Sequence, residues 1–227
     1  SIPSDIYEKW KNRMFQVLAN NFRVQYAERA LLDDLRKSSI DVAVIKGSAA
    51  AYYYPNPEYR SRGDIDIIVP PLQYDNAVEV LIKNDYKLSE KYHFFKHSNF
   101  SKNQISIELH RYFINNDDAD EQSTLPVPIN PCNNLIFDAI PNACMKKVGE
   151  YESSLLPDME NGLVLLQHIK QHIKKGLGLR QIIDWMMFVD KCLNDDAWNS
   201  KFCHIAQSNK AETLAKVVTR MCQLKMG

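Results

Sequence analysis

The chain has 227 residues, with 28 Lys and Arg against 28 Asp and Glu, so its formal net charge is zero. This balance argues against a protein that coats nucleic acid, which needs a basic surplus. The composition of 45% hydrophobic and 25% charged residues excludes a disordered chain. No apolar run reaches the roughly 18–20 residues of a membrane helix, so we expect no membrane association.

The cysteines do not suggest a metal or disulfide framework. Cys132, Cys144, Cys192, Cys203 and Cys222 include no CxxC pair. Their spacing fits neither a zinc knuckle nor a disulfide scaffold. We therefore expect reduced, mostly buried thiols and a cytoplasmic protein.

The first segment, residues 1–39, has a helical pattern. Ile6, Trp10 and Met14 recur at every fourth position, as on the apolar side of a helix. Asn20–Asn21 interrupts this pattern. The sequence therefore predicts two N-terminal helices in this segment.

The second segment, residues 40–155, alternates between strand and helix patterns. β-branched and apolar runs predict strands, and Pro- or Gly-containing stretches predict the turns between them. The predicted strands are 41–45, 64–69, 86–88, 92–97 and 104–110, with one or two more between 143 and 155. The predicted helices are 49–54, 72–84 and 133–140, and residues 115–131 form a polar loop.

The third segment, residues 156–227, contains helical patterns alone. We place the boundary near residue 156. The predicted helices cover a segment around 163–173, then 179–193, 196–207 and 210–225.

Two aspartates in the second segment indicate a cation site. Strand alternation places Asp64 and Asp66 on one face and Ile65 and Ile67 on the other. Like charges this close on a strand raise one pKa or attract a cation, and Mg²⁺ prefers carboxylate oxygens. The alternative is an edge strand with solvated acids.

A turn and a later strand complete the pattern. Gly47 and Ser48 follow a predicted strand and offer backbone N–H groups and a hydroxyl to a phosphate. On the 104–110 strand, Glu108 and His110 share the face opposite the apolar residues. Glu108 is therefore a candidate third carboxylate, with a half-exposed surface position as the alternative, and His110 either assists proton transfer or makes a structural hydrogen bond.

These residues carry a resemblance to a known family. Gly47-Ser48 followed by Asp64-Ile65-Asp66 and an acid on a later strand resembles the nucleotidyltransferase superfamily that includes DNA polymerase β. The fuller string resembles its branch of uncharacterised bacterial nucleotidyltransferases; it adds Ile45-Lys46, Tyr54-Pro55-Asn56-Pro57, Arg60 and Glu108-Leu109-His110.

The resemblance implies an α/β (α+β) fold, with a mixed β-sheet flanked by helices and then a C-terminal helical bundle. It also implies metal-dependent transfer of a nucleoside monophosphate from an NTP, ATP being the first choice, to a hydroxyl or similar acceptor on a small molecule or protein. Asp64 and Asp66 would bind Mg²⁺ or Mn²⁺, and Glu108 would be the third ligand or the general base. Gly47 and Ser48 would hold the triphosphate.

Basic residues are the candidate phosphate ligands. Lys46, Arg60 and Arg62 either bind phosphate oxygens or pair with nearby acids. A second basic group either faces the acidic cleft or forms a solvated helix face; it consists of His168, Lys170, His172, Lys174, Lys175 and Arg180. Of these, Lys174 and Arg180 are the possible auxiliary site residues.

Two other function classes remain open. A catalytically weak nucleotide-binding or regulatory module would keep the fold and bind an NTP without turnover. A toxin–antitoxin-like component would modify or restrain a partner protein.

Overall fold

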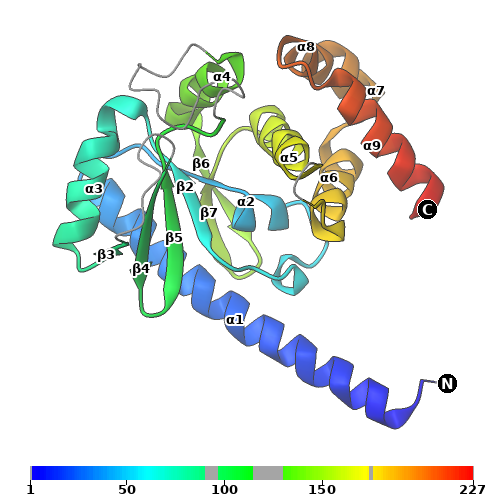
Figure 1. Cartoon of the computed structure of the whole chain (residues 1–227), viewed down its shortest axis with the longest axis horizontal. Helices are drawn as coiled ribbons and strands as arrows, with labels where there is room; N and C mark the ends of the chain where they lie inside the picture. Colours follow the sequence, from blue (N-terminus) through cyan, green and yellow to red (C-terminus); the bar gives the residue numbers. More distant parts are fainter. Residues whose placement is uncertain (1, 90–96, 115–129, 174–175, 227) are drawn as a thin grey trace.

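A computed structural model describes residues 2–89, 97–114, 130–173 and 176–226 of the chain. They form a mixed sheet of seven strands in the order β3-β4-β5-β2-β1-β7-β6 (Figure 1). The β2–β5 and β1–β7 pairs are parallel, and the other pairs are antiparallel. The strands are β1 Ala43–Ile45, β2 Ile65–Ile68, β3 Lys87–Leu88, β4 His97–Lys102, β5 Ile105–His110, β6 Cys144–Val148 and β7 Tyr151–Leu155.

Helices cover both faces of the sheet and make up the C-terminal part. They are α1 Ser4–Lys37, α2 Gly47–Ala51, α3 Tyr74–Lys83, α4 Pro131–Ala139, α5 Asp158–Ile173, α6 Leu179–Cys192, α7 Asp195–Ala197, α8 Cys203–Ser208 and α9 Glu212–Lys225, with a π-helical turn at Trp198–Phe202. The α/β fold with a C-terminal helical part, as expected, is confirmed. None of the described helices is both long and apolar enough to span a membrane.

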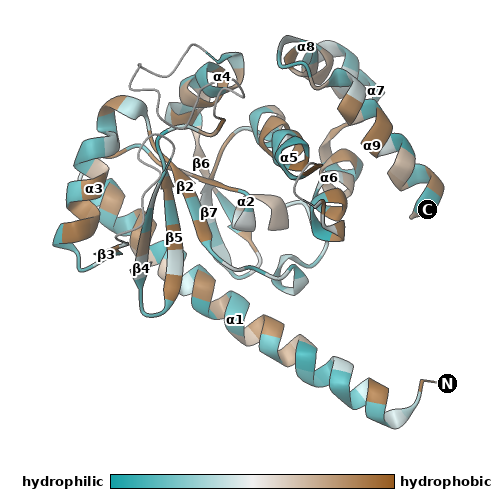
Figure 2. Ribbon diagram, in the orientation of Figure 1, coloured by the Kyte–Doolittle hydropathy of each residue, from teal (hydrophilic) through white to brown (hydrophobic). Residues whose placement is uncertain are grey.

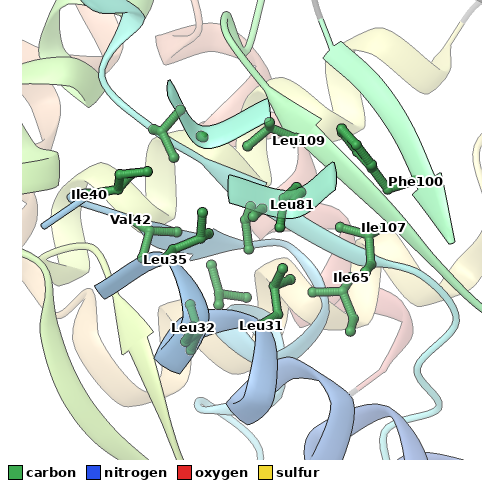
Figure 3. Packing of buried hydrophobic residues seen from close by; sticks show 14 of the residues in the cluster. Leu31, Leu32, Leu35, Ile40, Val42, Ile65, Leu81, Phe100, Ile107 and Leu109 are labelled. Atoms are coloured by element: carbon green, nitrogen blue, oxygen red, sulfur yellow. The ribbon is translucent and has the colours of Figure 1, made fainter. Parts of the chain in front are cut away.

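Alternation along the central strands separates the two cores. Ile65 and Ile67 of β2 are buried with residues of α1 and α3, and Figure 3 shows this packing. Ile68, which points the other way, is buried against α4 and α5. Asp66 lies on this second face, so the predicted period of two holds and directs its carboxylate away from the α1 side.

Helix α1 is continuous, so the predicted break at Asn20–Asn21 is wrong. Asn20 Nδ2 donates to Arg62 O at 2.8 Å, and Asn21 Nδ2 donates to Arg60 O at 2.9 Å. Asparagine disrupts a helix when its side chain competes for nearby backbone groups. Here those side chains bind a distant loop, and the helix runs through them.

The N-terminal half of α1 projects from the body of the molecule (Figure 1). Trp10 is 62% exposed, whereas Leu31 and Leu35 in the second half are fully buried. Figure 2 shows polar and apolar residues mixed along the projecting half. Only the second half of α1 therefore contributes to the core.

The C-terminal helices pack on the sheet region through aromatic residues. The rings of Tyr53 and Phe188 lie 5.2 Å apart, and Trp185 and Phe202 are fully buried in the same cluster. β7 ends at Leu155 and α5 begins at Asp158, so the predicted change to helices falls at 156–157. The division into domains at this point stays a prediction.

Two predicted elements lie partly outside the described residues. The strand predicted at 92–97 is described only at His97, where β4 begins. The polar loop predicted at 115–131 falls, for residues 115–129, outside the described part of the chain.

Candidate active site

Three carboxylates meet where β2 and β5 run side by side. The parallel register pairs Asp66 with Glu108, and Asp64 stands just before β2. One carboxylate oxygen from each of the three lies within 4.8 Å of the other two. The structure therefore brings together the three acids that the sequence predicts.

Lys46 places an ammonium group among these carboxylates. Its Nζ lies 2.6 Å from Asp66 Oδ1 and 3.7 Å from Glu108 Oε2. The backbone of Lys46 has φ 59°, a left-handed conformation that is uncommon for a residue other than glycine. This strained turn after β1 is what carries the side chain to the carboxylates, so the predicted pairing with nearby acids is the one the structure contains.

His110 contacts two of the acids, Asp66 and Glu108, through one ring nitrogen. Its Nε2 lies 3.1 Å from Asp66 Oδ1 and 3.2 Å from Glu108 Oε2, and the residue is 1% exposed. Because carboxylates only accept hydrogen bonds, Nε2 carries the proton. His110 thus holds the two carboxylates in place from within the protein.

The surroundings of the three acids raise the pKa of one carboxyl group and lower the pKa values of the other two. Burial and the charge of Asp66 raise the pKa of Asp64. Burial also acts to raise the pKa of Asp66, but the hydrogen bond from His110 and the charge of Lys46 outweigh it and hold that pKa well below its usual value. The hydrogen bond from His110 likewise lowers the pKa of Glu108. Asp66 and Glu108 are therefore anions at neutral pH, the form that binds a metal.

The donor set fits a hard divalent cation. Three carboxylates offer only oxygen, which Mg²⁺ and Mn²⁺ prefer. The ammonium of Lys46 against Asp66 shows that these anions already attract a cation. Asp64, Asp66 and Glu108 are thus the residues that would hold the metal implied by the fold.

A cleft of about 300 Å³ opens above the carboxylates. Its opposite wall comes from α5 and α6, which supply His168, His172, Arg180 and Gln181. These two histidines and Arg180 face the acidic cleft, as one of the two predicted alternatives has it, and Arg180 brings a positive charge to this wall. Lys170 is exposed and does not line the cleft, and Lys174 lies outside the described residues.

His168 is a neutral group on this wall. Burial, followed by the positive charges of Lys46 and His172, lowers the pKa of His168 to about 4. The rings of His168 and His172 lie 4.6 Å apart. At neutral pH His168 therefore offers a hydrogen bond to a ligand without adding charge.

Arg60 lines the cleft but is bound by Asp184. Its Nε donates to Asp184 Oδ1 at 2.8 Å, and its Nη2 donates to Asp184 Oδ2 at 2.6 Å. Tyr54 OH also donates to Asp184 Oδ1, at 2.8 Å. The sequence offered Arg60 as a phosphate ligand or as a partner of an acid; the structure contains the second, an ion pair that ties the 57–60 turn to α6.

Ser48 turns its hydroxyl into the protein. It is 1% exposed, and its Oγ donates to Glu28 Oε2 at 2.7 Å. Ser153 Oγ donates to the other oxygen of Glu28, also at 2.7 Å. Gly47 lines the cleft, whereas Ser48 does not. The predicted contact of the Ser48 hydroxyl with a triphosphate is therefore wrong. The hydroxyl instead binds Glu28, a buried acid on the apolar side of α1, and this hydrogen bond holds the turn in place.

Arg62 is also buried behind the turn rather than in the cleft. It is 4% exposed, and its Nη2 donates to Pro57 O at 3.4 Å. Burial lowers its pKa to about 10, against the opposing charge of Glu28. Arg62 does not line the cleft, so the structure does not support its predicted contact with a phosphate there.

Comparisons with known proteins agree with this geometry. The sequence matches the family of uncharacterised nucleotidyltransferases over residues 1–227. A search of curated protein sequences found no match. A solution structure of the antibiotic-resistance factor ANT(2'')-Ia is similar with a TM-score of 0.54 and 8% identity, covering 85% of this chain and 95% of that one. A crystal structure of ANT(2'')-Ia in complex with adenylyl-2''-tobramycin has a TM-score of 0.50 and 10% identity, covering 84% and 94%.

The mixed sheet and the acidic cleft agree with a nucleotidyltransferase, the class of protein that the family match names. The chain belongs to the family of uncharacterised nucleotidyltransferases, which its whole length matches. The resemblance first drawn from the sequence motifs is confirmed.

Proposed function

We propose that this chain transfers a nucleoside monophosphate from an NTP to a hydroxyl group of a small molecule, with Mg²⁺ or Mn²⁺ bound at Asp64, Asp66 and Glu108. The observation that carries the proposal is the meeting of these three carboxylates in a cleft whose opposite wall carries Arg180. The bound metal would neutralise the phosphate charge and polarise the α-phosphoryl group.

The positions of Glu108 and Arg180 in the cleft suggest their roles in the transfer step. The acceptor oxygen bonds to the α-phosphorus, the bond to the bridging oxygen breaks, and pyrophosphate leaves. Glu108 is half-exposed at the edge of the metal group, so we assign to it the proton of the acceptor hydroxyl. Arg180 lies on the wall where a bound triphosphate needs positive charge.

A small-molecule acceptor is supported by three points. The ANT(2'')-Ia structure of similar fold contains adenylylated tobramycin. The cleft of about 300 Å³ is at the small end of ligand sites, and the chain has no net positive charge for a long polymer. Hydroxyl-bearing small molecules, aminoglycosides among them, are therefore the first acceptors to test.

Pyrophosphate release from Mg-ATP with such an acceptor panel tests the proposal. Asp64→Asn keeps the shape but removes a metal ligand, and we expect a loss of at least about 100-fold in rate. Asp75→Asn is the matched control, because Asp75 is 80% exposed on α3. Equal rates in Asp64→Asn and wild type would refute the assignment. Tight NTP binding without turnover over the whole panel would instead indicate a nucleotide-binding module.

A further inference from the structure

Three buried polar side chains interrupt the apolar face of α1. Asn21, Gln25 and Glu28 are 1%, 4% and 4% exposed, and their spacing places them on one side of the helix. A buried polar group is costly unless it has a hydrogen-bond partner. Each of the three therefore needs a partner in a segment that packs on this side of α1.

These partners come from segments that lie far apart in the sequence. Asn21 Nδ2 donates to Arg60 O at 2.9 Å, in the loop before β2. Gln25 Nε2 donates to Val148 O at 3.1 Å, at the end of β6. Glu28 binds the turn that follows β1. One side of α1 therefore fixes three segments that the order of the chain does not hold together.

Glu28 joins the turn after β1 to a neighbouring strand. Ser48 in α2 and Ser153 in β7 each donate a hydroxyl to a different oxygen of Glu28, both at 2.7 Å. The two serines are 1% and 2% exposed. They are bound alike, but only Ser48 belongs to the turn that carries a side chain to the catalytic carboxylates.

This turn is strained and lies against two of those carboxylate residues. Lys46 has φ 59° and ψ −126°, a conformation that persists only where the surrounding structure holds it. Its carbonyl accepts from Ala50 N at 2.6 Å, and its ammonium lies 2.6 Å from Asp66. A Cβ on Gly47 would lie 3.7 Å from Asp64 O. A small shift of the turn would therefore disturb the surroundings of both aspartates.

We propose that Glu28 is a positioning residue of this site. Through Ser48 it holds the strained turn from which the ammonium group of Lys46 reaches Asp66. Glu28 does not itself line the cleft, so it acts through the turn and not on a bound nucleotide. Its part in catalysis rests on the proposed function, because a misplacement of about 1 Å in an active site can lower the rate by about 100-fold.

Ser48→Ala and Ser153→Ala are a matched pair of variants for the test. Each removes one hydroxyl from the same buried acid, so both should lower the melting temperature by similar amounts. Only Ser48→Ala frees the turn. Glu28→Ala would leave both hydroxyls and the charge of Arg62 without their acid and risks the fold, so the serine variants are the better choice.

The first measurement follows Lys46 by nitrogen NMR in the full chain, with no nucleotide present. The signal of Lys46 Nζ, assigned by its absence in Lys46→Met, should stand apart from the signals of exposed lysines because the ammonium is bound to a buried carboxylate. We expect Ser48→Ala to move it towards those signals and Ser153→Ala to leave it in place. A signal that stays in place in Ser48→Ala, or that moves equally in both variants, would overturn the proposal.

The second measurement separates kcat from KM in pyrophosphate release from Mg-ATP. Ser48→Ala should lower kcat by about 10-fold or more and change the KM for ATP by less than about threefold, because positioning acts on the transfer step. Ser153→Ala should stay within about twofold of wild type. Equal losses of kcat in the two variants would show a loss of stability alone. Absence of turnover in wild type would refute the proposed function, and the Lys46 signal would still decide the role of Glu28.

Discussion

Lys46 places a positive charge where a metal ion is expected to act. Its Nζ lies 2.6 Å from the buried Asp66 and 3.7 Å from Glu108, so it balances two anions in the chain without metal. Burial acts to lower the pKa of Lys46, but the charge and hydrogen bond of Asp66 outweigh burial and raise it. Lys46 is therefore charged at neutral pH.

Replacing this lysine tests its part in charge balance. Lys46→Met leaves Asp66 and Glu108 without their cation, and we expect a loss of about 1–3 kcal/mol in unfolding free energy in chelator. Saturating Mg²⁺ should restore part of the loss, so the variant gains more stability from Mg²⁺ than wild type does. Thermal melts with and without Mg²⁺ measure both effects. Lys170→Met, at an exposed position, is the control; melts in chelator that match wild type would contradict this role for Lys46.

His168 predicts a pH dependence of stability. Its folded pKa of about 4 lies below the ordinary 6.5, because of burial and then the charges of Lys46 and His172. Between pH 6.5 and 4 the unfolded chain binds a proton that the folded chain does not, so stability falls as pH is lowered through this window. His168→Asn removes that proton, and the stability lost between pH 7 and 4.5 should be smaller by about 1–3 kcal/mol.

Urea unfolding at pH 7 and pH 4.5 measures this difference. His204→Asn on α8 is the matched control, because His204 is exposed and should leave the wild-type pH dependence unchanged. If His168→Asn also keeps the wild-type pH dependence, His168 does not have the lowered pKa.

Among the elements, α5 and α6 form one wall of the cleft and pack closely against each other at Gly162. A Cβ on Gly162 would lie 2.2 Å from Phe188 Cζ and 2.5 Å from its Cε1. Phe188 is fully buried and in ring contact with Trp185 at 5.4 Å, so it has little room to shift. The close approach of the two helices therefore depends on the missing side chain.

Gly162→Ala should destabilise the protein, although alanine has a higher helix propensity than glycine. Alanine favours a helix by about 1 kcal/mol over glycine, but overpacking costs about 1–3 kcal/mol, and the clash is severe. Adding Phe188→Leu should recover part of the loss. Gly63→Ala, where a Cβ would meet nothing within 4 Å, is the control in the same urea melts. A stabilised Gly162→Ala protein would show that the helices are packed less closely than described.

The elements also show what the sequence could and could not supply. Period-two alternation at 64–69 and 104–110 correctly predicted which faces carry Asp66 and Glu108. The break at Asn20–Asn21 was wrong because the loop that binds those side chains comes about forty residues later in the chain. Helical periodicity is local, and no local pattern reports such a partner.

The role of a site residue could be predicted where it depends on neighbours in the sequence, and not where it depends on a partner far away along the chain. The three carboxylates follow from strand patterns and from the family resemblance, and the structure brings them together. The partners of Arg60 and Ser48 are Asp184 and Glu28, which lie 124 and 20 residues away along the chain. Glu28 carried a signal, since an acid between the apolar Val24 and Leu31 of α1 has to find a buried partner.

In the molecule as a whole, the zero net charge results from negative and positive charges that lie on opposite sides of the cleft. The acids gather along β2 and β5, and Arg180 and the histidines gather on α5 and α6 across the cleft. This arrangement provides for a metal and a triphosphate without a long basic surface. The prediction that the protein has no extended nucleic-acid footprint rests on this distribution.

We propose that the α-phosphoryl group of ATP is the one transferred, and the position of a label in ATP distinguishes this from transfer of the γ-phosphoryl group. ATP labelled at the α-phosphorus is incubated with Mg²⁺, the chain and the hydroxyl-bearing acceptor panel, in parallel with ATP labelled at the γ-phosphorus. We expect only the α label to appear on an acceptor, with one pyrophosphate released per transfer, and we expect Asp66→Asn to abolish both the labelling and the pyrophosphate release. Transfer of the γ label, or release of ADP, would contradict it.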